Sequence, residues 1–487
     1  MKEQNKNFYI TTTLPYINSE PHIGFAAEII KADVIARYQR QRGATVFFNT
    51  GTDEHGLKIY QKAQAAGLPV QEFCDLYSAK FRPLKEKLNL SYDKFIRTTD
   101  ADHKKAAQAF WLRCADAGDI YKKLYKVRYC VGCELEKTDS DLVNDRCPLH
   151  PDRELEIIEE ENYFFRFSKY QAQLLSLYES RPDFVLPSGR LNEIKTFVES
   201  GLQDFSISRL KAKMPHGVPV PGDDSQVMYV WFDALVNYIS TLGWPEEEGD
   251  FKRFWPGLQV CGKDNLRPQA AMWQAMLLSA GLPNSSQVLV FGFLTANGQK
   301  ISKSSGNTVD PFALADQYGA DALRYYLLSE IPPFSDGDYS EEKFRERYNA
   351  DLANGLGNLS SRVANLLEKN EIATAAKIDL QDAGSKGAVA EFEAKMKSYR
   401  LNEALQVIWE KIRESDEILT KAAPWKMEKL EDKVKVLQPL TQTILNLAYL
   451  LEPFLPAAAQ KVQAQFGARQ VKKGDNLFPR LVDAAKV

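Results

Sequence analysis

The sequence predicts an α/β fold with an open parallel sheet, followed by a region built from helices alone. Near the N-terminus, a strand-like run at residues 8–13 precedes a helical pattern at 26–41 and a second strand-like run at 46–48. Strand–helix–strand order is typical of a parallel sheet. Beyond about residue 341 strand signals nearly vanish, and amphipathic helical spacing continues to about 466. These two patterns predict at least two domains.

Between the two patterns, the residue composition and the hydrophobic pattern change over residues 116–225. This stretch holds a cysteine cluster, a short strand-like run at 163–167 and a proline-rich run at 214–222, and it predicts an insertion into the α/β domain. The α/β pattern resumes in four segments: 227–238, 258–262, a helix at 268–280, and a strand at 288–291. Residues 373–388 are expected to form an exposed loop between helices. We therefore divide the chain into 1–115 and 226–340 as the two halves of the α/β domain, 116–225 as the insertion, and 341–487 as the helical domain.

The composition is ordinary for a soluble globular protein. The 487 residues are 44% hydrophobic and 26% charged, with a net charge of -3, so a nucleic-acid partner would have to meet a local basic face. We expect neither a signal peptide nor a membrane span, because the N-terminus lacks an apolar core and no apolar run approaches roughly 18 residues. Six cysteines are too few for a disulfide scaffold of this size. The expected location is cytoplasmic.

A metal site is predicted by Cys130-Val131-Gly132-Cys133 followed by Cys147-Pro148-Leu149-His150. A shuffled chain of this composition would contain about 0.07 CxxC and about 0.06 CxxH matches, so chance does not explain the pair. Three thiolates and one imidazole are typical ligands of a tetrahedral zinc ion, whose closed coordination makes a structural role more fitting than a catalytic one. The alternative is two independent pairs of buried residues.

A phosphate-binding turn is predicted at Pro21-His22-Ile23-Gly24-Phe25, between the first strand and the first helix. Glycine allows close approach to the backbone, and the helix N-terminus offers N–H groups to phosphate. His22 would donate to a phosphate oxygen that gains negative charge when the α-phosphorus is attacked. A His-x-Gly match alone is expected about 0.3 times by chance, and the alternative is a histidine that caps an ordinary turn.

A second phosphate-binding segment is predicted at residues 300–307, where Lys300 and Lys303 lie in a serine-rich, glycine-flanked loop. Two lysines there can neutralise a leaving pyrophosphate without proton transfer. The alternative is an ordinary solvated loop. Together the two motifs resemble the signatures of class I aminoacyl-tRNA synthetases.

Within this class, the chain resembles the methionyl-tRNA synthetase family, and the resemblance extends over nearly the whole chain. Besides the zinc motif and residues 300–307, the matching segments are 12–18, 51–56, 204–209, 229–234, 262–264 and 423–425. The resemblance implies a Rossmann-like parallel-sheet catalytic domain with a zinc-bearing insertion, followed by an all-α anticodon-binding bundle. It also implies activation of L-methionine with Mg²⁺-bound ATP and transfer of the methionyl group to the 3′-terminal adenosine of tRNA(Met), the initiator included.

The resemblance also implies roles for individual residues. Asp53 would pair with the substrate ammonium, although a helix cap is its alternative; Arg209 would reach the carboxylate or phosphates. The remaining ATP contacts are His22, Gly24, Phe25, Gly262, Asp264 and Lys303, with Lys300 in support. The methionine pocket would comprise Asp53 with Leu14, Tyr16, Trp231, Ala234, Leu235, Tyr238 and Gln269, and the thioether would pack against rings. Without the resemblance, the stripe from Trp231 to Tyr238 would more often be core. A second metal at His55 has no convincing set of ligands.

In the helical region, the resemblance assigns anticodon recognition to Asn358, Arg362 and Trp425. A tryptophan can stack on an unpaired base, and Asn and Arg can bond to base edges. From the sequence alone, Trp425 after Pro424 would instead be buried at the start of a helix. Basic residues lie nearby, but acidic residues are mixed with them.

Four positions depart from the family pattern, of which Ile301, in place of methionine, conserves volume and should matter little. Phe25 replaces a histidine, which removes a donor that could supply up to about 3–4 kcal/mol of transition-state stabilisation. Asn265 and Gln269 stand where an aliphatic residue and a histidine are more common.

The chain ends soon after the predicted helices, which favours a monomer. A synthetase for isoleucine, leucine or valine would need a larger insertion, and the remaining rival is a non-catalytic tRNA-binding paralogue.

Overall fold

The computed structural model describes residues 7–133, 135–137, 141–301 and 308–481. Its chain divides into two units. The first unit comprises residues 1–21, 43–83 and 92–290, and the second comprises residues 22–42, 84–91 and 291–487. The first helix of the sequence therefore belongs to the second unit, although the strands before and after it belong to the first.

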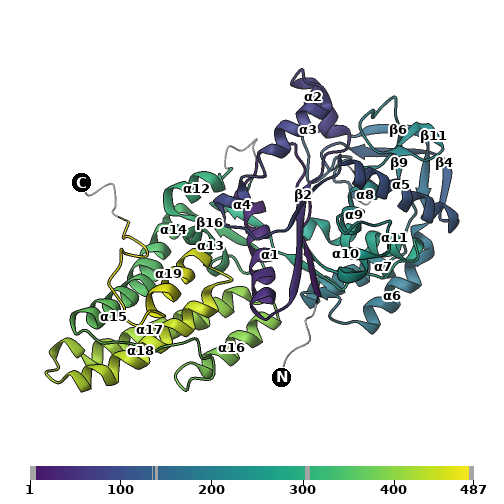
Figure 1. Ribbon diagram of the computed structural model, residues 1–487. Coiled ribbons are helices and arrows are strands. Elements are labelled where there is room, and N and C mark those ends of the chain that lie inside the picture. Colours follow the sequence, from purple (N-terminus) through teal and green to yellow (C-terminus); the bar gives the residue numbers. More distant parts are fainter. Residues whose placement is uncertain (1–6, 134, 138–140, 302–307, 482–487) are drawn as a thin grey trace. The chain divides into compact units, whose positions relative to one another are not determined.

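A six-stranded sheet organises the first unit, with the strand order β3-β2-β1-β12-β13-β7; its strand β2 is labelled in Figure 1. The strands are β1 Asn7–Thr11, β2 Thr45–Thr52, β3 Lys94–Arg97, β7 Val185–Leu186, β12 Leu258–Gly262 and β13 Gln287–Phe291. The pairs β3–β2, β2–β1, β1–β12 and β13–β7 are parallel. The predicted parallel sheet is confirmed, and the strands expected at 8–13, 46–48, 258–262 and 288–291 are all present.

Parallel pairing sets where the chemistry of this unit can lie. Because β2, β1 and β12 are neighbours and run the same way, their carboxyl ends meet at one edge of the sheet. The segments that follow these strands begin at Thr12, Asp53 and Lys263. Ligands of open α/β sheets bind at this edge.

Two antiparallel sheets lie within residues 120–228, whereas the predicted insertion, 116–225, also holds β7 of the parallel sheet. One sheet has the order β5-β4-β6-β8 and another the order β10-β11-β9. Their bounds are β4 Ile120–Cys130, β5 Leu135–Lys137, β6 Glu156–Phe165, β8 Phe205–Ser206, β9 Ser208–Leu210, β10 Pro219–Val220 and β11 Asp223–Met228. The long β4–β6 pairing runs from Ile120↔Phe165 to Tyr129↔Glu156 and places the cysteine cluster at its far end.

Short helices complete the first unit. They are α2 Leu57–Ala65, α3 Val70–Ala79, α5 Ala101–Asp116, α6 Gln171–Ser180, α7 Ser188–Glu199, α8 Val230–Ala234, α9 Asn237–Ser240, α10 Gly249–Phe254 and α11 Trp273–Ser279. The helix expected at 268–280 begins with a π-helical turn, Pro268–Met272, before α11. The segment 227–238 is the end of β11 followed by α8 and α9.

In the second unit, α1 (Ile23–Gln41) is tied to the C-terminal region by a buried ion pair. Arg324 lies 2.8 Å from Asp33 of α1, and neither side chain is exposed. The same guanidinium donates to the backbone carbonyls of Phe454 and Pro453. The helix begins at Ile23 and not at Ala26 as expected, because His22 caps it with its side chain.

The rest of the second unit is mainly helical. Its helices are α4 Leu84–Lys87, α12 Pro311–Tyr318, α13 Ala320–Ser329, α14 Glu341–Arg347, α15 Asn358–Lys369, α16 Lys386–Lys397, α17 Leu401–Ala422, α18 Leu430–Leu451 and α19 Pro456–Phe466. A small sheet of order β15-β14-β16 precedes most of them, formed by β14 Leu294–Ala296, β15 Gln299–Lys300 and β16 Gly337–Tyr339. A π-helical stretch, Tyr348–Gly357, leads into α15.

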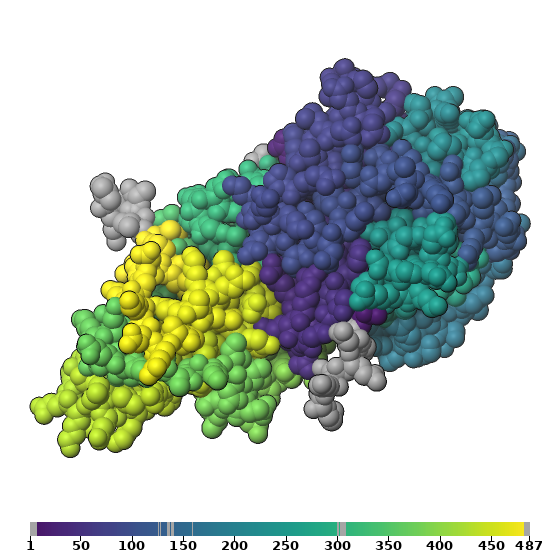
Figure 2. Space-filling model, viewed as in Figure 1, coloured from purple at the N-terminus to yellow at the C-terminus, as the bar shows by residue number. Residues whose placement is uncertain are grey.

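The predicted helical region is confirmed. Figure 1 shows α17 and α18 side by side, and in Figure 2 the light green and yellow atoms of the described C-terminal helices adjoin one another. The loop expected at 373–388 ends slightly earlier, where α16 begins at Lys386. Within the described ranges, no helix is long and apolar enough to cross a membrane.

Candidate active site

Asp53 and Tyr16 are held together by the backbone at the carboxyl end of β2. The two residues form a parallel bridge, in which Asp53 N–H donates to Pro15 O at 3.0 Å and Ile17 N–H donates to Asp53 O at 3.3 Å. The Tyr16 hydroxyl donates to the carbonyl of His55 at 2.6 Å. A buried carboxylate and a tyrosine ring therefore share the edge of the sheet where ligands are expected.

The predicted pocket wall from Trp231 to Tyr238 divides into two parts. Trp231 and Tyr16 pack against a small cluster that includes Ala234. Leu235 and Tyr238 belong instead to the main hydrophobic core of this unit. Trp231 and Ala234 therefore lie in a small cluster apart from the main core, and Leu14, which is also buried, lies on the segment that follows β1.

Gln269 contacts Tyr238 directly. Its amide Nε2 donates to the Tyr238 hydroxyl, and its side chain is buried in the π-helical turn. Tyr238 is fixed from the other side, where the Tyr9 hydroxyl donates to its backbone carbonyl at 2.9 Å. The position that departs from the family pattern thus retains a hydrogen bond to a predicted pocket residue.

The segment that follows β12 is partly exposed to solvent. Gly262 ends the strand, and Asp264 is exposed in the short 3₁₀ turn Lys263–Asn265. Asn265 Nδ2 donates to Asp264 Oδ1 at 3.3 Å. Since β12 neighbours β1, this carboxylate lies at the same edge of the sheet as the segment after β1.

A buried carboxylate behind the pocket wall was missed by sequence reasoning. Asp233, between Trp231 and Ala234, accepts from His55 Nδ1 at 2.5 Å and from His103 Nε2 at 2.7 Å. Burial by itself would raise the pKa of Asp233, but the two histidines outweigh burial and hold that pKa well below its usual range. His55 is thus a partner of this carboxylate through Nδ1. The contacts span more than 100 residues of sequence, so no local signal could reveal them.

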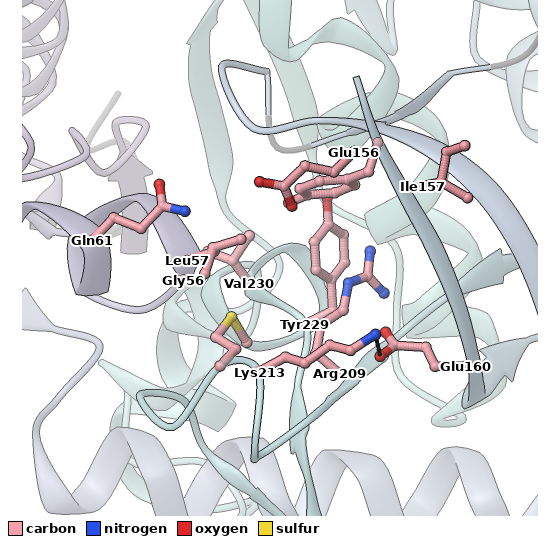
Figure 3. A pocket seen from close by; sticks show the side chains of 12 residues that line it. Gly56, Leu57, Gln61, Glu156, Ile157, Glu160, Arg209, Lys213, Tyr229 and Val230 are labelled. Carbon is pink, nitrogen blue, oxygen red and sulfur yellow. Dashed lines mark ion pairs between the residues drawn. The ribbon is translucent and has the colours of Figure 1, made fainter. Parts of the chain in front are cut away.

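Arg209 lies in a cavity of about 500 Å³ at the base of the insertion (Figure 3). Its guanidinium lies 4.4 Å from the ring of Tyr229 and 5.3 Å from that of Tyr129. It also donates to Ser206 Oγ at 2.7 Å and to Ser208 O at 2.8 Å. Of the residues predicted to contact the substrates, Arg209 alone lines this cavity.

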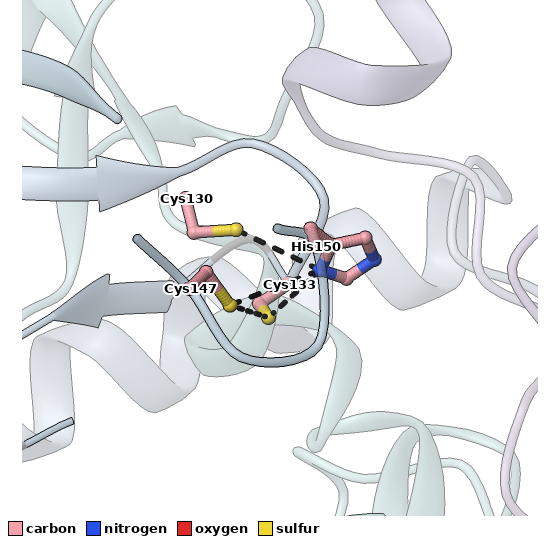
Figure 4. A group of neighbouring side chains, drawn as sticks. All are labelled: Cys130, Cys133, Cys147 and His150. Atoms are coloured by element: carbon pink, nitrogen blue, oxygen red, sulfur yellow. Dashed lines mark hydrogen bonds between the residues drawn. The ribbon is translucent and has the colours of Figure 1, made fainter. Parts of the chain in front are cut away.

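The four predicted metal ligands come together (Figure 4). The ligand atoms of Cys130, Cys133, Cys147 and His150 all lie within 4.8 Å of one another. Cys133 Sγ is 3.4 Å from Cys147 Sγ and 3.3 Å from His150 Nδ1. Zinc–sulfur bonds of about 2.3 Å in a tetrahedron require sulfur atoms about 3.8 Å apart, so the donor set fits a four-coordinate zinc ion.

Gly132 supplies a second reason why this loop suits a metal. A Cβ at this position would lie 2.5 Å from Cγ of the His150 ring. A side chain there would therefore push the imidazole away from the three sulfur atoms. The predicted zinc motif has the geometry that its spacing implied.

In the second unit, His22 caps helix α1 with one ring nitrogen and can donate a hydrogen bond from the other. Its Nδ1 accepts from the N–H of Gly24 at 3.1 Å, so in the neutral imidazole the proton is on Nε2. A Cβ on Gly24 would lie 2.9 Å from the His22 ring, which explains the glycine. Phe25 follows in the first helical turn and is partly exposed. The capping alternative and the phosphate-donor hypothesis are therefore compatible.

The second phosphate motif is only partly described. Lys300 pairs with Thr295 through the backbone of β15 and β14. Lys303 lies outside the described residues. After this gap in the described residues, the carbonyl of Val309 accepts a hydrogen bond from Ile23 N–H at 3.0 Å, at the start of α1.

The predicted anticodon residues gather at one place on the helical bundle. Arg362 donates to Asp416 at 2.5 Å and to Thr420 at 3.2 Å, and its guanidinium lies 5.5 Å from the Trp425 ring. Asn358 is exposed one turn before Arg362 on α15. The alternative of a buried Trp425 is wrong, because this side chain is 47% exposed.

Comparisons with known proteins agree with this arrangement. The family model described as "tRNA synthetases class I (M)" matches residues 8–154 and 133–364. A methionine–tRNA ligase of Nostoc sp. is 43% identical over 484 residues, covering 96% of this chain and 91% of its own length. One from Thermotoga maritima is 43% identical over 471 residues, covering 93% of this chain and 74% of its own.

Solved structures extend the match to three dimensions. Mycobacterium tuberculosis methionyl-tRNA synthetase in complex with methionyl-adenylate superposes with a TM-score of 0.90 at 37% identity, over 98% of this chain and 100% of that one. Its apo form gives a TM-score of 0.83 at 33% identity, over 99% of each chain. This chain therefore belongs to the methionyl-tRNA synthetase family of class I tRNA synthetases.

Proposed function

We infer that this chain is a methionine–tRNA ligase. In the first step the methionine carboxylate attacks the α-phosphorus of ATP, which forms methionyl-adenylate and releases pyrophosphate. In the second step a ribose hydroxyl of the 3′-terminal adenosine of tRNA(Met) attacks the activated carbonyl and releases AMP. The observation that carries this inference is family membership over nearly the full length, together with similarity to a methionyl-tRNA synthetase solved in complex with methionyl-adenylate.

We assign the amino-acid site to the residues at the carboxyl ends of β1 and β2. Asp53 would hold the ammonium group, since it is a buried carboxylate beside Tyr16. The side chain would lie against Leu14, Trp231 and Ala234. Leu235 and Tyr238 would support this wall from the core, and Gln269 would orient the Tyr238 hydroxyl.

We assign ATP contacts to the residues that the family resemblance implies. Gly262 and Asp264 would contact the ribose, because an exposed carboxylate can accept from its hydroxyls. His22 would donate from Nε2 to a phosphate oxygen, and Gly24 and Phe25 would border the same group. Lys300 and Lys303 would neutralise the departing pyrophosphate. ATP would enter as its magnesium complex, in which the ion screens the phosphate charge.

The zinc motif would hold one structural ion. Cys130, Cys133, Cys147 and His150 fill all four positions of a tetrahedron, so the ion would stabilise the loop and take no part in the reaction. Asn358, Arg362 and Trp425 would read the anticodon of elongator and initiator tRNA(Met). A cytoplasmic monomer with domain boundaries near 115, 225 and 340 remains our proposal.

The deciding experiment is methionine-dependent ATP–pyrophosphate exchange by folded, zinc-loaded protein. We expect exchange with methionine and none without it, and we expect Asp53→Asn to raise the KM for methionine more than the KM for ATP. Glu72→Gln, which alters an exposed carboxylate of α3 outside the assigned site, is the control. A protein that binds tRNA(Met) but shows no exchange would instead be the non-catalytic paralogue.

A further inference from the structure

A buried carboxylate with no role in the proposed reaction lies directly between Asp53 and His55. The side chain of Glu54 is fully buried and forms a forked ion pair with Arg97, the last residue of β3. Arg97 Nε donates to Glu54 Oε1 at 2.7 Å, and Arg97 Nη2 donates to Glu54 Oε2 at 2.8 Å. Paired bonds of this kind fix both the distance and the orientation of the two groups. The fork therefore ties the end of β3 to the segment that follows β2.

The remaining acceptor positions of this carboxylate are also filled. Thr52 Oγ1 donates to Glu54 Oε1 at 2.6 Å, and Thr99 Oγ1 donates to Glu54 Oε2 at 2.5 Å. An ionised carboxylate accepts about four hydrogen bonds, so these contacts use the capacity of Glu54. Glu54 therefore bonds to the protein and is unsuited to bind a substrate.

The backbone of Glu54 is held as well. Its N–H donates to Thr98 Oγ1 at 2.9 Å, and its carbonyl accepts from His216 Nε2 at 2.8 Å. Asp53, one residue earlier, is bonded through its backbone to the segment that follows β1. The position of Asp53 thus depends on β1 on one side and, through Glu54, on β3 on the other.

Buried charge makes this arrangement sensitive to Arg97. A buried carboxylate that loses its partner is strongly destabilised, because the protein interior does not replace its lost hydration. Glu54 would then move toward solvent or take up a proton, and either change alters its bonds. Because neighbouring Cα atoms are only about 3.8 Å apart, a shift of Glu54 displaces Asp53 as well. A displacement of about 1 Å in a positioned group can cost roughly 10²-fold in rate.

The second partner of Arg97 is of a different kind. Arg97 Nη2 also donates to Asp75 Oδ1 of α3 at 2.6 Å, and the Asp75 side chain is 56% exposed. Ion pairs with exposed carboxylates contribute little, because water and salt screen them. The effect of Arg97 should therefore pass through Glu54 and not through Asp75.

We propose that Arg97 is a positioning residue for methionine binding, which acts through Glu54 to set the Asp53 carboxylate against the substrate ammonium. This proposal rests on the proposed function, because it takes Asp53 as the residue that holds that ammonium. The guanidinium of Arg97 bonds to Glu54 and Asp75, and it affects the substrate only through Asp53.

The test compares two variants of the whole chain with the wild type. Arg97→Lys keeps the positive charge but cannot form the fork, and Glu54→Gln keeps the shape but removes the charge. Each should weaken binding of methionine and of L-methioninol, which carries the ammonium but no carboxylate, by roughly tenfold or more. γ-Methylthiobutyrate, which carries the thioether and the carboxylate but no ammonium, should bind as it does to the wild type. Titration calorimetry measures these affinities, with displacement titration for the weakest ligand.

Two control variants separate this contact from other arginine pairs. Asp75→Asn removes the exposed partner of Arg97, and Arg190→Lys alters an arginine of α7 that is paired with Glu193. Both should bind all three ligands as the wild type does. A loss in Asp75→Asn as large as that in Arg97→Lys would show that α3 carries the effect, which would overturn the proposal.

The double variant tests whether the two residues act through one contact. Arg97→Lys combined with Glu54→Gln should lose no more affinity for methioninol than the more affected single variant, because residues in one network are not additive. Losses that add would overturn the proposal. Equal losses for methioninol and γ-methylthiobutyrate would overturn it too, since the pair would then support the whole pocket and not the ammonium site.

Pyrophosphate exchange keeps this proposal distinct from the proposed function. In exchange, Arg97→Lys and Glu54→Gln should raise the KM for methionine and leave the KM for ATP near its wild-type value. If the wild type exchanges normally and both variants bind methioninol normally, the positioning role alone fails. If the wild type binds methionine without exchange, the proposed function fails, and calorimetry still decides the role of Arg97.

Discussion

His55 and Asp233 face each other in the interior of the first unit, with His55 Nδ1 2.5 Å from Asp233 Oδ2 and neither side chain more than 1% exposed. The second oxygen of Asp233 lies 2.7 Å from His103 Nε2, and the other nitrogen of His103 lies 3.0 Å from Ser240 Oγ. One carboxylate therefore joins the end of β2, helix α5 and the α8–α9 segment. It fixes Trp231 and Ala234 relative to the loop that follows Asp53.

Replacing Asp233 tests whether this carboxylate positions the pocket wall. Asp233→Asn keeps the shape but puts an amide N–H₂ against one imidazole N–H, which leaves a buried donor unsatisfied at a cost of about 1–3 kcal/mol. We expect a lower free energy of unfolding and a KM for methionine that rises more than the KM for ATP. Denaturant unfolding and exchange kinetics measure the two effects. Asp224→Asn, at an exposed position of β11, is the control.

His216 makes the protein sensitive to acid. Burial, assisted by the neighbouring His55, lowers the pKa of His216 to about 4, and its Nε2 donates to the carbonyl of Glu54 at 2.8 Å. In the unfolded chain the pKa is about 6.5, so between pH 6.5 and 4 the unfolded state binds more protons. Stability should fall through this window as pH falls, by up to about 1.4 kcal/mol per pH unit.

The variant His216→Gln isolates this contribution, since its amide can still donate to Glu54 O. Unfolding free energies at pH 4.5, 5.5 and 7 should show a shallower acid loss in the variant than in the wild type. An unchanged slope would mean that another group controls acid sensitivity in this region. The side chains that face His216 are His55, whose ring centre lies 4.9 Å away, and Cys74, whose Sγ lies 3.6 Å away.

Metal loss should reach the methionine pocket through packing. Tyr129 directly precedes Cys130, and Tyr129 and Val131 belong to the group that packs with Tyr16 and Trp231. Cys147→Ser should weaken zinc binding by roughly tenfold or more and raise the KM for methionine. Metal analysis and exchange kinetics are the measurements. Cys114→Ser, in helix α5, should keep one zinc ion per chain and normal kinetics.

Trp425 offers a test of anticodon reading apart from catalysis. Its exposed ring beside Arg362 is placed to stack on a base, and such stacking contributes about 1–3 kcal/mol. Trp425→Ala should therefore lower kcat/KM for tRNA(Met) by roughly 5- to 150-fold while exchange stays unchanged. Leu430→Ala, which removes another exposed apolar side chain, is the matched control. Equal effects of both variants on aminoacylation would argue against a specific role for the tryptophan.

Local patterns predicted most of the architecture, and contacts distant in sequence account for what they missed. The strands at β1, β2 and β12 and the helices after residue 341 follow from periodicity. The edge strand Val185–Leu186 has two residues, too few for any period, and it joins the sheet only through β13. The π-helical turn at Pro268–Met272 likewise was not predicted, and within it Gln269 bonds to Tyr238, which is 31 residues away in the sequence.

The candidate site shows the same difference between features set by local patterns and features set by contacts distant in sequence. The zinc ligands are close in sequence, and their spacing alone predicted their geometry. Asp233 has no such signal, because its partners His55 and His103 lie 178 and 130 residues away. The exposure of Trp425 was also beyond sequence reasoning, since the motif Ala-Pro-Trp suits a buried or an exposed ring. Three-dimensional packing decides such cases.

Phe25 is the residue where this chain departs most directly from the signature of its family. It lies in the first turn of α1, where its N–H donates to His22 O at 3.1 Å and its side chain is partly exposed. Phe25→His should fold normally, because a partly exposed substitution of this kind changes stability by within about 0.5 kcal/mol. An imidazole there adds a donor near the phosphates while His22 still caps the helix. We therefore expect exchange to stay the same or rise.

Phe25→Leu separates the ring from the donor. If the phenyl ring is only a tolerated replacement, exchange by Phe25→Leu should match that of the wild type, and Phe25→His should equal or exceed both. A large loss in both variants, with unchanged unfolding free energy, would show that the phosphate site has been rebuilt around the ring. In that case the ring itself would shape the entrance that His22 and Gly24 border, and the missing histidine would be compensated by packing and not by a new donor.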